Sequence, residues 1–488
     1  QDGVRLRLEF LSPMDPRDLK LLSMPVGLLR AEVSSDRPRS VQLYFDVTGE
    51  WAAGSSDRRI TWDGGFRIRP SQPRLFRETH NYPDWGEVHW IAADGPTSEC
   101  GEDKEVRGAF AMGSSPPRDV RYPRAASDQW PVFAHHWDLG TVGAPVVRRA
   151  VIAHARRDVA TFYGDVCPAY WTRHFADGAA MTEWAAGAFE EIRSRMKSLD
   201  AEVLARARAA GGEPLAAIAC LAFRQSFAAG ELALHGNEPF YFSKSMGIAG
   251  ASLVQSLEVM YPSAPALLAF NPELLRMQTA PLIEALLRDD WREIHAPSDL
   301  GAWPVAGGPV SPAAPGSDAT ATLALLESLA GGGDAKTVLA RLAPFAGEND
   351  LSLRALLALR LLSSDRGRIL QARLTEPTPT DLLVDLLLGG GRGTVASEPN
   401  RAPVSADAIL WEAALAPPSA GPSVDEQIAE LDQQGPHGVA DAALSFLDEE
   451  PAAPVSGPAS EAEDIVSDFV PSPPPGDDGF IVPSPSLG

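Results

Sequence analysis

The chain of 488 residues has no lysine or arginine after Arg401, although 16 aspartates and glutamates lie between residues 402 and 488. The first 401 residues carry 42 basic and 49 acidic side chains, so this part is mildly acidic and the remainder strongly acidic. A basic stripe, which nucleic acids and anionic membrane surfaces require, is missing throughout. We therefore expect neither nucleic acid nor a membrane surface as a partner.

Cysteine and long apolar runs are scarce as well. Cys100, Cys167 and Cys220 lie far apart, show no CxxC spacing and allow one disulfide at most, which leaves the redox compartment open. No apolar run reaches 18 residues, so we expect no membrane span. The glycine-rich stretches "GGGDAK" and "GGGRG" lack the lysine and hydroxyl of a phosphate-binding loop. No cofactor and no metal are expected.

The first part of the sequence alternates like antiparallel strands. "RLRLEF" places Leu6, Leu8 and Phe10 between charged residues, and "SVQLYFDV" places apolar side chains on one face. "RITW", "FRIRP" and "EVHWIAA" continue this pattern between proline, glycine and serine clusters. The pattern predicts half-buried strands up to about residue 155, packed as a β-sandwich.

The period changes to that of helices near Asp177, a predicted N-cap. Gly211 and Gly212 are expected to end the first long helix, and Pro214 to begin a second that carries Phe223 and Leu232. Further helices are predicted over Pro265–Phe270, Pro272–Arg288, Ala319–Leu329, Ala335–Pro344, Leu351–Leu362 and up to Ala416.

Three domains follow from these changes. Residues 1–176 are predicted to form the β-sandwich, residues 177–416 a helical domain, and residues 417–488 an acidic tail rich in proline, serine and alanine. The tail cannot bury enough apolar surface to offset its ordering entropy, so we expect it to be disordered. Its apolar islands "GVADAALSFL" and "DGFIVPSPSLG" are either spacer or docking elements for a protein partner.

Long stretches in the right order resemble the secreted glutaminase A family: "EFLSPMDPRDLKLLSMPVGLLRAEV", "WPVFAHHWDLGTVGAPVVRRAVIAHARRD", "GGEPLAAIACLAFRQSFAAGELAL", "PFYFSKSMGIAGASLVQSLEVMYPSAPALLAFNPELL" and "DLGAWPVAGG". The resemblance covers residues 1 to about 308 well and reaches residue 416 weakly. It implies an antiparallel β-sandwich followed by an (α/α)6-type helical toroid, here incomplete, and an extracellular or periplasmic location.

The sequence also departs from the family pattern. It begins inside the family's sandwich, so we expect the first strands to be missing and the exposed sheet edge to need cover. The family's acidic "MPVEESGN"-like segment is replaced by "GGPVSPAAPGSDATATLALL", in which Pro309 and Val310 remain but Ser311 and Pro312 stand where carboxylates are expected. A second acidic segment before "FAGENDLSLRALLAL" is missing. Hydrolysis requires positioned acid and base groups, so these changes predict a loss of catalysis.

Six residues in the family-like segments are the candidates for a site. Arg224 and Glu231 are seven positions apart, a spacing that predicts one helical face and a grip on an amino acid's carboxylate and ammonium, or else a structural pair. The candidates for catalysis are Glu258, Asp299 and Glu231, and those for substrate binding are Arg224, Tyr261 and Trp303.

Other constellations are interpreted as structural. His135 and His136 are adjacent on a strand and should point to opposite faces, which argues against a metal pair. Asp138 is expected to cap a turn. His235 precedes the turn sequence "GNEP" and is expected in a solvated loop, and the aromatic residues of "FYF" are expected in the core.

Three functions remain open at this stage. The first is a glutaminase-like protein without catalysis, which serves as a scaffold or binding protein and uses its acidic tail to interact. The second is an active glutaminase that releases ammonia from L-glutamine. The third, suggested by the toroid alone, is a carbohydrate-active protein. A small amide or sugar ligand fits all three.

Overall fold

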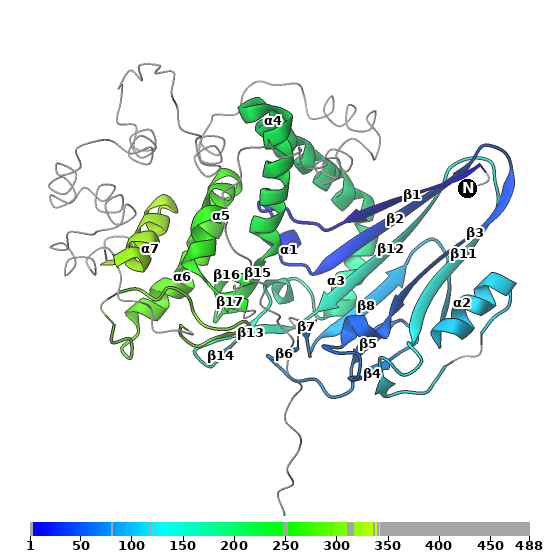
Figure 1. Ribbon diagram of the computed structural model, residues 1–488, viewed down its shortest axis with the longest axis horizontal. Coiled ribbons are helices and arrows are strands. Elements are labelled where there is room, and N and C mark those ends of the chain that lie inside the picture. The colour runs from blue at the N-terminus through cyan, green and yellow to red at the C-terminus, as the bar shows by residue number, and fades with distance from the viewer. Residues whose placement is uncertain are drawn as a thin grey trace, which may run out of the picture.

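The computed structural model in Figure 1 describes residues 3–79, 82–116, 119–246, 252–293, 295–309, 317–334, 337–338 and 341. The expectations for the acidic tail, for the rewritten segment after Pro309 and for the helices beyond residue 341 lie outside these residues. Within them, an antiparallel β-sandwich is followed by a helical part, as predicted. The sheets lie on one side of the molecule and α4 to α7 on the other (Figure 1).

Two antiparallel sheets form the sandwich. The larger has seven strands in the order β1 (Val4–Leu11), β2 (Val26–Ser35), β12 (Val146–Ala155), β8 (Glu87–Ala92), β5 (Arg67–Pro70), β4 (Arg59–Trp62) and β10 (Arg124–Ala125). The smaller has three strands in the order β3 (Arg39–Thr48), β11 (Val132–Val142) and β9 (Thr97–Gly101). Their facing side chains form a buried core that contains Trp62, Phe66, Trp90 and Phe133.

The seven-stranded sheet is the middle layer of the described part. In β2, Leu29 points into the sandwich core, whereas the neighbouring Leu28 points into the core shared with the helices. Ala150 and Val151 of β12 divide in the same way. Because successive strand residues face opposite sides, this sheet is covered on both faces, and one continuous core joins the sandwich to the helical part.

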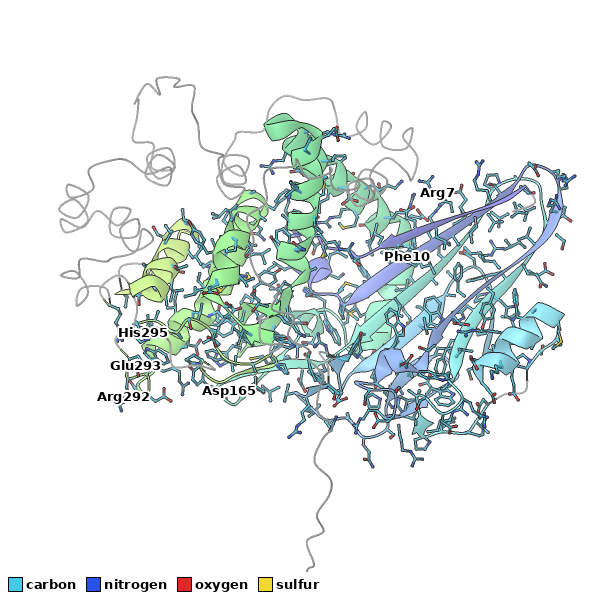
Figure 2. The ribbon with its side chains drawn as sticks, in the orientation of Figure 1. Arg7, Phe10, Asp165, Arg292, Glu293 and His295 are labelled. Carbon is cyan, nitrogen blue, oxygen red and sulfur yellow. The ribbon has the colours of Figure 1, made fainter. Side chains whose placement is uncertain are left out.

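Strand β1 corrects one expectation. The alternation is present, but Leu6, Leu8 and Phe10 are 48%, 40% and 76% exposed instead of half-buried (Figure 2). The charged face is the one that packs, because Glu9 accepts two hydrogen bonds from Arg193 of α4, at 2.8 and 2.9 Å. β1 pairs only with β2 and lies at the sheet edge, beyond the cover of the smaller sheet.

The helices of the described residues are α1 (Leu19–Leu22), α2 (Asp103–Met112), α3 (Gly178–Gly187), α4 (Phe189–Ala228), α5 (Leu257–Phe270), α6 (Pro272–Leu287) and α7 (Ser317–Leu329). The predicted N-cap is confirmed, since Asp177 accepts a hydrogen bond from the backbone of Ala180 at 2.8 Å. The predicted break is also confirmed, because Gly211 and Gly212 leave helical geometry inside α4. α5 begins eight residues before the predicted Pro265.

Short strands join the two parts: β6 (Glu78–Thr79), β7 (Tyr82–Pro83), β13 (Asp158–Phe162), β14 (Asp165–Pro168), β15 (Gly230–His235), β16 (Glu238–Met246), β17 (Ser252–Val254) and β18 (Val305–Ala306). Two 3-10 turns span Gly49–Ala52 and Tyr170–Arg173. None of the helices among the described residues combines the length and the apolar character that crossing a membrane requires.

Candidate functional site

The stretch after α4 is a β-hairpin and not the continuation of a helix. β15 and β16 pair in an antiparallel register that places Glu231 opposite Phe242 and His235 opposite Glu238. Gly236 makes the turn with a φ of 60°, a conformation that glycine adopts without strain. Leu232, expected on a helix, is therefore a buried strand residue. The expectation that Arg224 and Glu231 share a helical face is wrong, because the chain leaves the helix between them.

The hairpin presents one polar face to the sandwich. Side chains on paired strands alternate between two faces, so Glu231, Phe242 and Lys244 point to the same side. The opposite face of β16 carries Tyr241, which is fully buried and donates a hydrogen bond to the backbone oxygen of Phe227 at 3.1 Å. Burial raises the pKa of the Tyr241 hydroxyl, which therefore stays neutral and structural.

The centre of this polar face is Lys244. Its Nζ atom lies 3.0 and 2.9 Å from the two carboxylate oxygens of Glu78 in β6. The indole Nε1 of Trp303 donates a further hydrogen bond to Glu78 Oε1 at 3.0 Å. The side chain of Glu78 is only 9% exposed, so one shielded carboxylate is held by a cation and an indole. We refer to Glu78, Lys244 and Trp303 as the seam site, because they join the sandwich to the helical part.

Local structure positions each member of the seam site. Thr79, next to Glu78, donates a hydrogen bond at 3.1 Å to Asp84, whose side chain is fully buried. Trp303 is held by a backbone hydrogen bond from its N–H to the Ser252 oxygen at 2.7 Å, and its ring packs on Phe242. Glu78 is therefore held in β6, Lys244 in β16, and Trp303 in the loop between α6 and β18.

A second ion pair crosses the same seam. The guanidinium of Arg156, from the loop after β12, lies 2.6 Å from Glu231 Oε2. The same guanidinium packs over the ring of Trp85 at 5.5 Å. Glu231, a predicted catalytic candidate, is thus the partner of a cation from the sandwich, and its predicted partner Arg224 is exposed on α4.

Three further predicted residues lie in the loop before Trp303 or on α5, which is hydrogen-bonded to that loop. Asp299 is 7% exposed, and its carboxylate accepts hydrogen bonds from the backbone N–H of Gly301 at 2.9 Å and from the Ser298 hydroxyl at 3.1 Å. The backbone of Ser298 accepts a hydrogen bond from Leu257 at 2.9 Å, which brings the exposed Glu258 at the start of α5 to this loop. Tyr261, one helical turn later, is half-buried against the core.

His235 is not a solvated loop residue. It ends β15, and its ring packs on Phe162 and Phe240. Its Nε2 atom lies 3.4 Å from Asp165, labelled in Figure 2, and its Nδ1 atom lies 3.3 Å from Glu284. The turn sequence correctly predicted the hairpin end, but a partner on β14 and another on α6 are long-range contacts that the local sequence does not encode.

A cavity of about 440 Å³ opens between α6 and the end of α7. Glu327 on its wall is 3% exposed and accepts a hydrogen bond from Thr279 at 2.7 Å. Charged residues of both signs share this wall, namely Arg276, Glu284, Arg288, Glu327 and Asp334. The cavity therefore offers both an anion-binding and a cation-binding side.

Sequence reasoning missed Glu78, Lys244 and Arg156. Lys244 carried a signal, because a lysine inside the aromatic strand "PFYFSKS" must find a partner if the strand is buried. Glu78 and Arg156 carried none, since their partners are distant in sequence. The expectation that His135 and His136 point to opposite faces is confirmed, as the two rings face Trp90 and Phe110 respectively. Asp138 accepts a hydrogen bond from Gly140 at 2.8 Å, as expected of a turn cap.

The described residues contain no group of three or more His, Cys, Asp or Glu that could hold a metal ion. The seam site instead joins two opposite charges, the ammonium of Lys244 and the carboxylate of Glu78, which neutralise each other.

Comparisons with known proteins agree with this organisation. Residues 1–206 match a domain of unknown function (DUF5127), and residues 212–323 match the glutaminase A six helical-hairpin domain. Glutaminase A of Aspergillus oryzae is 30% identical over 318 residues, which are 62% of this chain and 46% of that protein. A probable glutaminase of Arthroderma benhamiae is 25% identical over 328 residues, 62% of this chain and 38% of that protein. The chain thus spans less than half the length of these relatives.

Proposed function

The chain is a divergent member of the glutaminase A family, and we propose that it binds a glutamine-sized amide at the seam site without hydrolysing it. In this proposal the body is a hydrolase-shaped binding protein or scaffold. The proposed ligand binding is supported by the shielded carboxylate of Glu78, which is held between Lys244 and the indole of Trp303.

Three arguments support a zwitterionic amide as the ligand. The side chain of Lys244 is partly exposed, at 25%, which leaves room for a ligand carboxylate to approach it. Trp303, at 7% exposure, packs on the fully buried Phe242, which holds the indole that donates to Glu78 in place. The relatives named above are glutaminases, and glutamine carries the carboxylate, ammonium and short apolar stem that these groups complement.

The loss of hydrolysis rests on the state of the carboxylates. General acid–base catalysis requires a carboxyl group that is free to exchange a proton with the substrate. Glu78 and Glu231 are neutralised by Lys244 and Arg156, and Asp299 accepts hydrogen bonds within its own loop. In the sequence, Ser311 and Pro312 stand where the family resemblance leads us to expect acidic residues. Neither side chain can act as a carboxylic acid.

A second candidate function is an active glutaminase, and one observation favours it. The cavity between α6 and α7 combines the buried carboxylate of Glu327 with Arg276 and further charged groups, in a volume that suits an amino acid. If hydrolysis takes place there, Glu327→Gln should abolish it, whereas Lys244→Met at the seam should leave it unchanged.

The tail and the location of the protein are part of the proposal as well. Residues 417–488 carry acidic side chains without a single basic one, and we infer that they recruit a basic protein partner. The family resemblance favours an extracellular or periplasmic site of action. A pull-down that compares the full chain with a chain ending at Ala416 tests the tail, because equal capture of the partner by both would refute it.

The experiment that tests the proposed function measures binding and turnover on the same preparation. Isothermal titration calorimetry with L-glutamine should give a binding signal that Lys244→Met removes. Ammonia release from L-glutamine should stay at the level of Asp299→Asn and Glu258→Gln variants. Turnover that either of these two substitutions abolishes would refute the loss of catalysis, and an absence of binding would refute the seam site.

A further inference from the structure

The sandwich contains a cavity of its own, whose lining shares no residue with the seam site. It measures about 420 Å³, within the range of small-molecule sites. Its walls come from the β4–β5 turn, from β9 and from the segment around Tyr122, and its apolar part consists of Trp62, Phe66 and Tyr122. None of the residues that line this cavity is among the candidates for the glutaminase site.

Ser98 of β9 lies in the wall of this cavity and is exposed. It stands directly opposite His135 of β11 in the strand register, and its Oγ atom lies 2.9 Å from His135 Nδ1. The other ring nitrogen, Nε2, lies 3.2 Å from the backbone oxygen of Trp90. A serine, a histidine and an orienting acceptor are therefore aligned in one chain of hydrogen bonds.

The proton positions in this chain follow from the acceptor at its end. A carbonyl oxygen can only accept, so the proton of the imidazole must sit on Nε2 and be donated to Trp90. Nδ1 then carries the lone pair, and the Ser98 hydroxyl must donate to it. The lone pairs of Ser98 Oγ are left for the cavity. Burial lowers the pKa of His135 to about 4, so the imidazole is neutral and can accept a proton throughout the physiological range.

We propose that Ser98 and His135 form a nucleophilic site in the sandwich that is acylated by small uncharged esters. An activated serine requires a base within hydrogen-bond reach and a third group that orients the base, and all three are present. The residues that line the cavity include no lysine or arginine that would bind an anion, and its aromatic wall suits an aromatic or branched apolar acyl group.

The reaction balances without any further reactant. Ser98 Oγ attacks the ester carbonyl carbon, and its proton passes to His135 Nδ1. The C–O bond to the leaving group breaks, and His135 returns the proton to the departing alkoxide, which leaves as an alcohol. Water then hydrolyses the acyl-serine by the same proton path in reverse.

Labelling with diisopropyl fluorophosphate tests this site. The probe is uncharged, and its reaction forms the Ser98 O–P bond while fluoride leaves with the serine proton. Peptide mass spectrometry should find the adduct on Ser98 in the full-length protein and in Ser40→Ala, an exposed serine of β3, and should find none in Ser98→Ala. His135→Gln should slow labelling by about 10²-fold or more, the usual contribution of a general base.

The pH dependence separates a base from a structural neighbour. Because the pKa of His135 is lowered to about 4, the base is fully deprotonated and the labelling rate should be flat between pH 6 and 8, whereas a serine without a base would react through its alkoxide and label faster as the pH rises. A folded wild-type protein that shows no adduct on Ser98, or labels Ser98 no faster than Ser40, would overturn the proposal. If His135→Gln does not fold, the comparison of Ser98→Ala with Ser40→Ala decides.

Discussion

Lys244 and Glu78 are 166 residues apart in the chain, yet the lysine ammonium lies 2.9 and 3.0 Å from the two carboxylate oxygens. The pair links a strand of the helical part to a loop of the sandwich, and Glu78 is largely shielded from water. If the lysine were removed, the shielded carboxylate would remain desolvated without a cation to stabilise its charge, which is unfavourable. The pair therefore contributes both to the junction of the two parts and to the charge pattern that a ligand meets.

Removing one member of this pair should destabilise the protein more than removing both. We expect Lys244→Met and Glu78→Gln each to lower the free energy of unfolding by about 1–3 kcal/mol, the usual cost of an unsatisfied buried polar group. The double variant should lose less than the sum of the two. Urea denaturation of the four proteins measures this coupling. Asp290→Asn is the matched control, since Asp290 pairs with Arg288 at 2.9 Å but is 66% exposed, and a solvent-screened pair of this kind should contribute little to stability. Additive losses at the seam would contradict the account.

Trp303 should report on ligand binding. Its Nε1 donates to Glu78 and its ring packs on Phe242, so Trp303→Phe keeps the packing but removes the hydrogen bond. We expect the affinity for L-glutamine to fall by about 5–10-fold, which corresponds to one hydrogen bond of roughly 1 kcal/mol. Trp51→Phe is the control, because Trp51 lies in the sandwich and is 57% exposed. The same loss of affinity in both variants would show that Trp303 does not contact the ligand.

Two buried histidines should make the protein sensitive to acid. Burial lowers the pKa of His135 to about 4 and that of His154 to about 3, whereas both take a value near 6.5 in the unfolded chain. The unfolded state therefore binds more protons below pH 6.5, and stability is fully present above pH 6.5 and lost as the pH falls towards 4 for His135 and towards 3 for His154. At pH 5 each histidine should contribute a loss of roughly 2 kcal/mol. Urea unfolding at pH 7.5 and pH 5 tests this, and equal stability at the two values would contradict it.

Gly230 should tolerate no side chain. A Cβ atom there would lie 1.9 Å from the hydroxyl oxygen of Tyr241, whose ring is fully buried. Gly230→Ala should therefore cost at least about 1–3 kcal/mol through overpacking at the start of the hairpin. Gly108→Ala is the control, because Gly108 lies inside α2 with no neighbouring atom within 4 Å of its Cβ position. That substitution should stabilise the protein by about 0.5–1 kcal/mol, as glycine is unfavourable inside a helix. Thermal unfolding of both variants compares the two directions.

Local patterns predicted the local elements well. The alternation of "SVQLYFDV" placed Leu43 and Phe45 correctly in the sandwich core, and Asp177 and Gly212 mark the predicted helix boundaries. The pattern of β1 was right as well, but its packed face was not. Alternation predicts two faces but not which of them is covered. In β1 the charged face packs, because Glu9 forms a salt bridge with Arg193 of α4.

The candidate site was less accessible to sequence reasoning. Glu231 was placed on a helix because its spacing from Arg224 fits 3.6 residues per turn, yet the aromatic strand that follows pairs with it and makes a hairpin. Trp303 was identified through the family-like segment, but its partners Glu78 and Lys244 were not, since tertiary pairing brings them together. The functional roles of Glu258 and Asp299 remain predictions that the variants above address, and that of Tyr261 remains a prediction as well.

The most direct test of the account is ammonia release from L-glutamine by the full-length chain, measured beside calorimetric binding of the same ligand. We predict a binding signal that Lys244→Met removes, and ammonia release no higher than that of Asp299→Asn. Robust release that Asp299→Asn or Glu258→Gln abolishes would contradict the account and identify the chain as a working glutaminase.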